Sequence, residues 1–220
     1  MSFSIYTDAV EDLLTFVMHL SKPMDKSLLK DRNLHIIFSI TLIAVMGVSS
    51  ITPAFPAIRE SLGLSNQQVG WMITFFSGPG IILTPLFGIL ADRYGRKTIL
   101  IPSLFLYSIA GFACFFSRDF EVLLLLRFLQ GSGAASLGAL NITLVGDIYP
   151  PKDRAKVMGI NASVLSIGTA SYPAIGGALT LLGWHYPFLL PLLGIPVGFA
   201  VMFGLKNPEP SNDQNFIAYM

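Results

Sequence analysis

Apolar residues run along this chain in long segments, and polar residues gather in the short stretches between them. Six segments are long enough to cross a bilayer, for which about 20 apolar residues are needed. Each is continuously apolar and lacks the alternation of barrel strands, so each is predicted to be a helix. The expected spans are 34–57, 69–91, 98–117, 122–148, 157–182 and 186–205. Their short connections predict an antiparallel bundle.

Composition supports a membrane protein over a water-soluble one. Of 220 residues, 53% are hydrophobic and only 12% are charged, against about 25% charged in ordinary soluble domains. The mean hydropathy is +0.65. A soluble globule of this size could not bury so much apolar surface, and we therefore expect an all-α membrane protein. The net charge of +1 gives no reason to expect nucleic acid as a partner.

Lysine and arginine set the expected orientation. If the N-terminus is cytoplasmic, the outside loops hold two basic residues, Arg59 and Arg118. The inside segments hold Lys22, Lys26, Lys30, Arg32, Arg93, Arg96, Lys97, Lys152, Arg154, Lys156 and Lys206. This bias predicts that both termini are cytoplasmic, most simply at the cell membrane. Residues 1–33 then form a cytoplasmic leader, 34–205 the transmembrane domain, and 206–220 the start of a cytoplasmic linker.

The chain shows no constellation typical of an enzyme. His19, His35 and His185 are isolated and lack metal-ligand spacing with any cysteine or carboxylate. A phosphate-binding loop of the G-x-x-x-x-G-K-[ST] kind is absent. The single cysteine, Cys114, excludes an internal disulfide. We therefore expect no enzymatic activity, no cofactor and no metal site.

Charge concentrates directly after the second span, in the sequence GILADRYGRK at 88–97. Its glycines, Gly88 and Gly95, permit close helix approach and a tight reversal. On charge alone, Arg93, Arg96 and Lys97 are equally well explained as topology anchors. The order Gly88-Ile-Leu-Ala-Asp92-Arg93-Tyr-Gly95-Arg96-Lys97-Thr-Ile-Leu100 resembles, position for position, the signature loop of the major facilitator superfamily, G-x-L-a-D-r-x-G-r-k-x-x-l.

The fourth span carries a second resemblance to this superfamily. Residues 123–135, LLLLRFLQGSGAA, are similar to its motif l-x-x-x-R-x-x-q-G-x-g-a-a. A charge such as Arg127 inside a bilayer costs about 2.5–3.5 kcal/mol on insertion scales. At helical spacing one stripe contains Arg127, Gly131, Ala134, Gly138 and Asn141, which suits a water-filled cavity for substrate or proton coupling. The alternative is that Arg127 extends to the outer membrane surface.

The first and fifth spans resemble patterns of twelve-span drug:proton antiporters. Residues 47–56, GVSSITPAFP, are similar to g-x-x-x-x-x-P-v-x-P. Residues 168–177, GTASYPAIGG, are similar to g-x-x-x-g-P-x-x-G-G, with matching residues at Gly168, Pro173, Gly176 and Gly177. Tyr172 stands where the pattern has glycine, which predicts looser helix packing. The alternative is a merely flexible helix rich in glycine and proline.

The resemblance covers residues 34–206 and implies one six-helix half, built as a 3+3 inverted repeat, of a two-half transporter. In the family the halves rock about a central site, and the loop after the second span locks the cytoplasmic side. By resemblance, Asp92 and Arg96 belong to this gate, Arg96 pairs with Asp147, and Asp153 and Arg154 extend the network. A C-terminal half, or a second half-transporter, is the expected partner.

Three functions remain open from the sequence. Proton-coupled export of small amphipathic compounds is favoured by the four motifs. A facilitator or symporter for a sugar or other metabolite shares the signature loop. A non-transporting truncated half that needs a partner is the third possibility. The acids nearest the membrane interior are Asp92 and Asp147, at its cytoplasmic boundary, so any coupling proton is carried there or in the other half.

Overall fold

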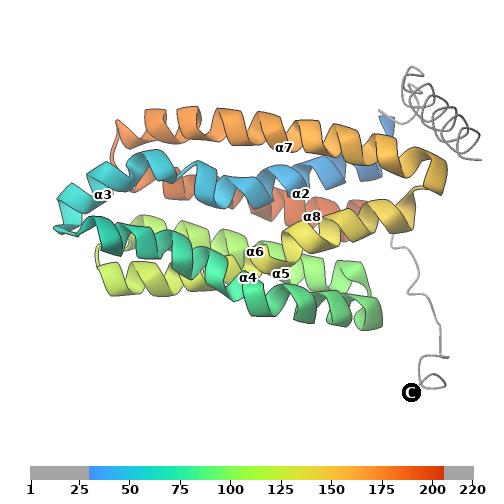
Figure 1. Cartoon of the computed structure of the whole chain (residues 1–220), viewed down its shortest axis with the longest axis horizontal. Helices are drawn as coiled ribbons and strands as arrows, with labels where there is room; N and C mark the ends of the chain where they lie inside the picture. Colours follow the sequence, from blue (N-terminus) through green and yellow to red (C-terminus); the bar gives the residue numbers. More distant parts are fainter. Residues whose placement is uncertain (1–29, 206–220) are drawn as a thin grey trace, which may run out of the picture.

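The computed structural model describes residues 30–205 as a bundle of antiparallel helices (Figure 1). Most of the predicted leader and all of the predicted linker lie outside the described residues. The elements are α2 (Arg32–Ser49), the 3₁₀ turn η2 (Thr52–Ala54), α3 (Phe55–Leu62), α4 (Asn66–Tyr94), α5 (Arg96–Phe116), α6 (Phe120–Ile148), α7 (Pro151–Thr180), the 3₁₀ helix η3 (Tyr186–Leu193) and α8 (Gly194–Gly204).

Together these elements make six membrane-crossing units, and no strand occurs in residues 30–205. The predicted all-α membrane fold is therefore confirmed. Five of the units are long and apolar enough to be recognised as spans by composition, and the first runs over the whole of Arg32–Leu62. The remaining unit, α7, is the fifth along the chain and contains more serine, glycine and threonine together than any of the other five.

The first and last spans depart from regular helices. The first was predicted to end at residue 57, but α3 continues it to Leu62 after a break between Ser49 and Phe55. Pro53 and Pro56 lie in this segment, where their missing N–H groups favour short, interrupted helices. Pro187 and Pro191 act in the same way on the last span, whose first part is the 3₁₀ helix η3.

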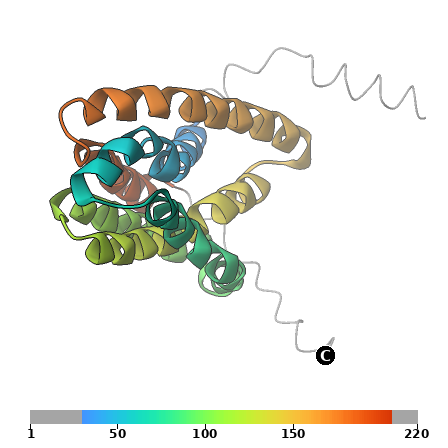
Figure 2. The ribbon, with the colours of Figure 1, turned by 60° about the vertical axis from the view of Figure 1, so that its left-hand side comes forward.

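Helix α6 lies at the centre of the bundle and packs closely on two neighbours (Figures 1 and 2). A Cβ at Gly131 would overlap the carbonyl oxygen of Phe76 on α4. A Cβ at Gly133 would lie 2.6 Å from the backbone nitrogen of Tyr107 on α5. Because small residues allow such close helix contacts in membranes, this glycine-rich stretch fixes where α4 and α5 lie.

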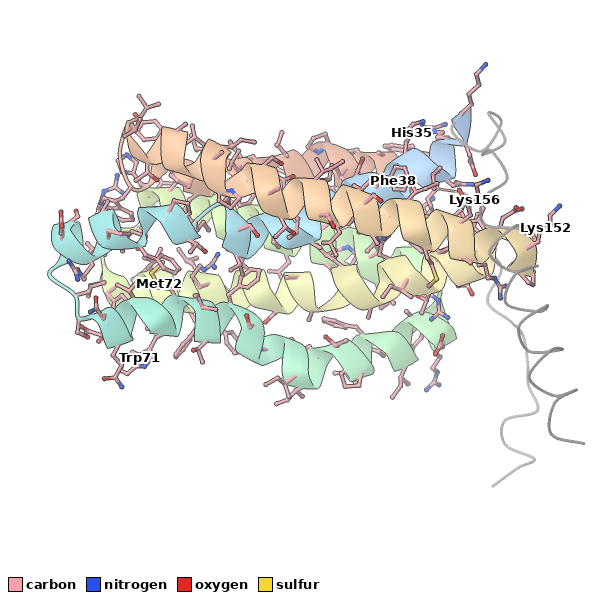
Figure 3. The ribbon with its side chains drawn as sticks, turned by 45° about the horizontal axis from the view of Figure 1, so that its top comes forward. His35, Phe38, Trp71, Met72, Lys152 and Lys156 are labelled. Carbon is pink, nitrogen blue, oxygen red and sulfur yellow. The ribbon has the colours of Figure 1, made fainter. Side chains whose placement is uncertain are left out.

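Two helices, α4 and α7, leave much of their surface uncovered. Neighbouring residues on α4 show the contrast: Met72 points into the bundle and is fully buried, whereas Trp71 points away and is 43% exposed (Figure 3). Further along α4, Ile81 and Ile82 are 81% and 73% exposed. A Cβ at Gly88 would meet nothing within 4 Å. No described helix approaches Gly88, so the close helix approach expected there stays a prediction.

Helix α7 packs tightly on α2 through the segment that resembles the antiporter pattern. A Cβ at Gly176 would overlap the carbonyl oxygen of Ser50, and one at Gly168 would lie 3.0 Å from Leu42 and Val45. Tyr172 is 9% exposed and joins the same buried cluster as α2. The looser packing predicted from Tyr172 is wrong, because its ring lies beside the contact at Gly168 and does not hold the helices apart.

A matched pair of glycines tests this contact. We expect Gly176→Ala to lower the stability of the protein, by about 1–3 kcal/mol as for other overpacked interiors, because the methyl group overlaps the Ser50 carbonyl. Gly177→Ala is the control, since its nearest neighbour would be Pro53 Cβ at 3.8 Å. The readout is the temperature at which the buried thiol of Cys114 reacts with a fluorescent maleimide. Equal temperatures for the two variants would contradict the close contact.

Candidate functional site

The side chain of Arg127 is completely buried between α2, α4 and α6. Its Nη1 donates hydrogen bonds to the Gly47 carbonyl at 2.9 Å and to Gln130 Oε1 at 2.8 Å. Its Nε lies 3.4 Å from the Met72 carbonyl, and the guanidinium lies 4.4 Å from the centre of the Phe76 ring. Within residues 30–205 no carboxylate pairs with it. Carbonyl groups and an aromatic face therefore compensate the charge.

The break in the first span explains why Arg127 binds there. In a continuous helix the Gly47 carbonyl would accept from the N–H of Ile51, but that N–H bonds to Val48 instead. Arg127 therefore supplies the missing donor at the end of α2. A cation is also favoured at this end of a helix, where the helix dipole is negative. The arginine and the helix break stabilise each other.

This geometry decides between the two predictions for the Arg127 side chain. It also changes the expectation that the stripe of residues from Arg127 to Asn141 lines a water-filled cavity. Extension to the outer surface is wrong, because the side chain has no exposed area. Nor does the stripe line one open cavity: Gly131 is packed against α4, and Asn141 is 4% exposed. Gly138 alone among the four candidate residues is exposed. Their roles in substrate or proton coupling stay a prediction.

A second buried polar group joins three helices and was missed from the sequence. The Thr41 hydroxyl on α2 donates to Asn161 Oδ1 on α7 at 2.6 Å and accepts from Asn141 Nδ2 on α6. Thr41 also lies 3.2 Å from the Ile37 carbonyl of its own helix. We call Thr41, Asn141 and Asn161 the amide cluster. The available signal was that each is an uncharged polar residue inside a predicted span.

The charged residues of the signature loop meet at the end of the bundle where α4 ends and α5 begins, which we call the basic end. Arg96 forms ion pairs with Asp92 and with Asp147, and its Nε lies 3.1 Å from Asp147 Oδ2. The Arg96–Asp147 contact expected from the resemblance is therefore present. Lys152 and Lys156 lie at the same end, at the start of α7 (Figure 3).

Gly95 makes the turn that brings these charges together. It ends α4 and precedes α5 with φ 92° and ψ 141°, a conformation that side chains rarely adopt. Arg93 stacks on the ring of Tyr94, with its Cζ 5.5 Å from the ring centre. Lys97 Nζ lies 3.4 Å from the carbonyl of Leu205. Basic side chains of the loop thus make specific contacts at this end.

Arg154 does not extend the Arg96 network as expected. Its Nε donates to the Tyr149 carbonyl at 2.8 Å, which braces the turn between α6 and α7. The Tyr149 hydroxyl donates to Asp31 Oδ2 at 2.6 Å, while Asp31 Oδ1 caps α2 by accepting from the N–H of Asn33. Burial and then the Asp31 carboxylate raise the pKa of the Tyr149 hydroxyl. This Asp31–Tyr149 link was not predicted from the sequence.

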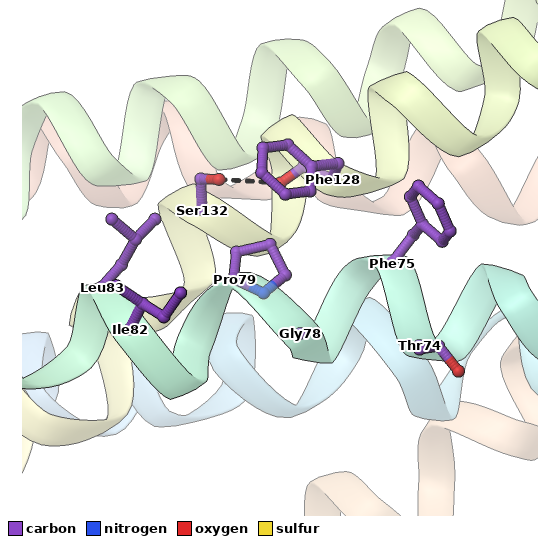
Figure 4. Close-up of a pocket in the computed structure, with 8 residues that line it drawn as sticks. All are labelled: Thr74, Phe75, Gly78, Pro79, Ile82, Leu83, Phe128 and Ser132. Atoms are coloured by element: carbon purple, nitrogen blue, oxygen red, sulfur yellow. Dashed lines mark hydrogen bonds between the residues drawn. The ribbon is translucent and has the colours of Figure 1, made fainter.

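An apolar pocket of about 460 Å³ lies between α4 and α6 on the outside of the bundle (Figure 4). Phe75, Pro79 and Phe128 are among its lining residues. Its two hydroxyl groups are engaged by their own helices: Ser132 donates to the Phe128 carbonyl at 2.9 Å and Thr74 to the Gly70 carbonyl at 3.4 Å. The pocket therefore suits an apolar ring or chain.

The family model of the Major Facilitator Superfamily matches residues 37–218. The chain belongs to the major facilitator superfamily. This agrees with the resemblance of its loop and fourth span, and it places the chain in a family of transporters and not of enzymes.

Similar proteins include two that are named for drug resistance. Multidrug resistance protein 1 of Bacillus subtilis is 29% identical over 84% of this chain and 48% of its own length. Quinolone resistance protein NorA of Staphylococcus aureus is 29% identical over 81% of this chain and 46% of its own. An uncharacterised MFS-type transporter of Mycobacterium tuberculosis is 30% identical over 73% of this chain and 23% of its own. The chain thus spans less than half the length of these relatives.

Solved structures agree with the fold. A bacterial homologue of the human lysosomal transporter Spinster, in an inward-facing and occupied conformation, matches with a TM-score of 0.68 and 23% identity over 90% of this chain and 48% of that one. The human organic anion transporter MFSD10 matches with a TM-score of 0.67 and 20% identity over 80% of this chain and 48% of that one. At these identities the likeness shows the superfamily fold.

The contacts of Arg127 predict that lysine cannot replace it. Arg127→Lys keeps the positive charge, but a single ammonium nitrogen cannot bond to Gly47 and Gln130, reach the Met72 carbonyl and also place a planar group over the Phe76 ring. We expect export of a fluorescent amphipathic dye from membrane vesicles to fall at least about tenfold, the effect of losing about 1.4 kcal/mol. Arg59→Lys, the same change on α3 and outside the signature loop, is the control. Export at the unchanged rate in Arg127→Lys would show that charge alone suffices.

Proposed function

We propose that this chain is the N-terminal half of an exporter that moves small amphipathic compounds out of the cell in exchange for protons. In this proposal the basic end faces the cytoplasm, as the distribution of lysine and arginine favours. The half rocks against a second six-helix unit, so that a central site opens to one side of the membrane at a time.

The observation that carries the proposal is the packing of α7 on α2. Within the segment resembling the drug:proton antiporter pattern, 168–177, the two helices are in close contact, since a Cβ at Gly176 is excluded by the Ser50 carbonyl and one at Gly168 would crowd Leu42 and Val45. Pro173 lies inside α7, between the contacts at Gly168 and Gly176. The names of two relatives, Multidrug resistance protein 1 and Quinolone resistance protein NorA, support the same class of substrate.

We assign the Arg96 ion pairs to a cytoplasmic gate. Asp92 and Asp147 are 66% and 35% exposed in their side chains, and Arg96 is 17% exposed. Pairs this accessible to water contribute about 0–1 kcal/mol each. Such weak contacts suit a gate, because it must open in every transport cycle.

The uncovered helices support the presence of a second unit. Large apolar side chains are exposed on both α4 and α7, such as Ile82 at 73% and Ile167 at 65%. The chain also spans less than half the length of its relatives. We propose that α4 and α7 face the second six-helix unit, which is either the rest of a longer polypeptide or a second copy of this chain.

Loss of the Asp92 charge tests the gate. We expect Asp92→Asn to insert normally and to reduce proton-driven export to less than about a tenth of the original rate, because Arg96 loses one of its two ionic partners. Glu60→Gln, an exposed carboxylate in α3, is the matched control. The measurement is dye efflux from vesicles with an imposed pH gradient. Full efflux by correctly inserted Asp92→Asn protein would refute the gate, and efflux independent of the gradient would refute proton coupling.

Cross-linking in native membranes tests the second unit. In a background with Cys114→Ala, we expect Ile82→Cys on α4 to form a cross-link with the second unit when benzophenone-4-maleimide is attached to its thiol and activated by light. Ile109→Cys on α5, also apolar and 59% exposed, is the control and should react with lipid-soluble reagents only singly. Dimers on a denaturing gel indicate a second copy, and a mobility shift without dimers indicates a longer polypeptide. Equal cross-linking of both variants would contradict the assignment.

A further inference from the structure

The amide cluster of Thr41, Asn141 and Asn161 contains a buried hydrogen-bond acceptor that no residue satisfies. Asn141 is 4% exposed, yet its Oδ1 has no partner among residues 30–205. The amide nitrogen of the same side chain is engaged, because it donates to the Thr41 hydroxyl. An unpaired polar atom inside a protein is costly, and more so in a membrane interior, where water cannot replace the missing partner. The cluster is therefore complete only when a donor is supplied.

The cluster lies deep in the membrane. Each of its residues is about 10–15 Å along its helix from the basic end, given a rise of about 1.5 Å per residue. This depth is close to the middle of a hydrocarbon core about 30 Å thick. Three helices contribute to it, namely α2, α6 and α7. Buried polar residues at this depth are commonly part of a substrate path.

The remaining capacity of the cluster defines what it can bind. The single proton of the Thr41 hydroxyl is directed to Asn161 Oδ1 at 2.6 Å, so Thr41 offers no further donor. Asn141 Oδ1 accepts only, so its partner must carry an N–H or O–H group. The described carboxylates lie in the end regions of the helices and the loops between them, which makes the recognition a hydrogen bond and not an ion pair.

The surroundings allow a ligand to approach from one side. Gly138, one turn before Asn141 on α6, is exposed, and a Cβ there would meet nothing within 4 Å. Asn161 is half-buried. Asn141 Oδ1 itself is covered in this conformation, so binding must accompany a rearrangement that uncovers it. Alternating access supplies such rearrangements in every transport cycle.

We propose that the amide cluster is a specificity site that selects transported compounds carrying an N–H or O–H donor, through a hydrogen bond to Asn141 Oδ1. This inference rests on the proposed function, whose substrates it narrows. Thr41 and Asn161 are positioning residues, because they hold the Asn141 amide with its oxygen directed away from Thr41. Amphipathic compounds without a donor bind through apolar contacts alone and are insensitive to this site.

The test compares two amphipathic cations in the protein purified from its native membrane with any second unit attached. The dye 4′,6-diamidino-2-phenylindole carries amidinium N–H donors, whereas tetraphenylphosphonium carries none. We expect Asn141→Leu to weaken equilibrium binding of the first about tenfold and to leave the second within about twofold. Asn141→Asp keeps the acceptor and should retain or strengthen binding of the first, because a charged acceptor makes a stronger bond. Thr143→Val on the same helix, whose hydroxyl bonds to Leu140, is the control.

The outcomes separate the two proposals. Equal weakening of both probes in Asn141→Leu, or no weakening of either, overturns the specificity site. Loss of donor binding in Asn141→Asp overturns it as well, since that variant still accepts. If the unaltered protein binds neither probe, amphipathic cations are not its substrates and both proposals fail. If the protein discriminates as expected but exports neither probe from vesicles, the site stands and the export function is overturned.

Discussion

The hydrogen bond from Arg127 to the Gly47 carbonyl is the contact on which the arrangement of this half depends. It occurs where the first span is interrupted, so the carbonyl lacks its usual helical partner and can accept a hydrogen bond from the guanidinium. Inside a membrane there is no water to replace either partner, so separating the two groups would be costly. The adjacent Gly131 presses α6 onto α4 at Phe76, whose ring lies against the same guanidinium. Three helices are thereby fixed at one point.

The bundle is unequal in how firmly its parts are held. Helices α5 and α6 share a long close contact that includes Gly133 and Tyr107. Helix α4 and helix α7 lie at the margins, with exposed apolar side chains along much of their length. Each packs along one neighbour and touches its backbone at a glycine: Gly131 of α6 meets α4, and Gly176 of α7 meets the end of α2. Such local contacts fix position while leaving the outer faces available to another unit.

Hydropathy and short motifs were sufficient to predict the helices and the superfamily. The six spans follow from apolar length, and the Arg96–Asp147 pair followed from the resemblance of the loop. The break after Ser49 was not predicted, because prolines near a helix end are compatible with several geometries. Arg127 was expected to face water, because its actual partner could not be foreseen. The Gly47 carbonyl is free to accept from Arg127 only because the helix is broken after Ser49. The Thr41–Asn161 bond joins residues far apart in the chain, and nothing in the local sequence of either one encodes it.

Gly95 is the last residue before α5 and the first after α4, so one residue alone joins two long helices. A connection of this length contains no slack. Any tilt of α4 must therefore either move α5 with it or change the backbone dihedral angles at Gly95. Arg96 is the next residue, and its ion pairs with Asp92 and Asp147 connect this turn to α4 and α6. A change in the angle between α4 and α5 therefore also changes the distances in these ion pairs.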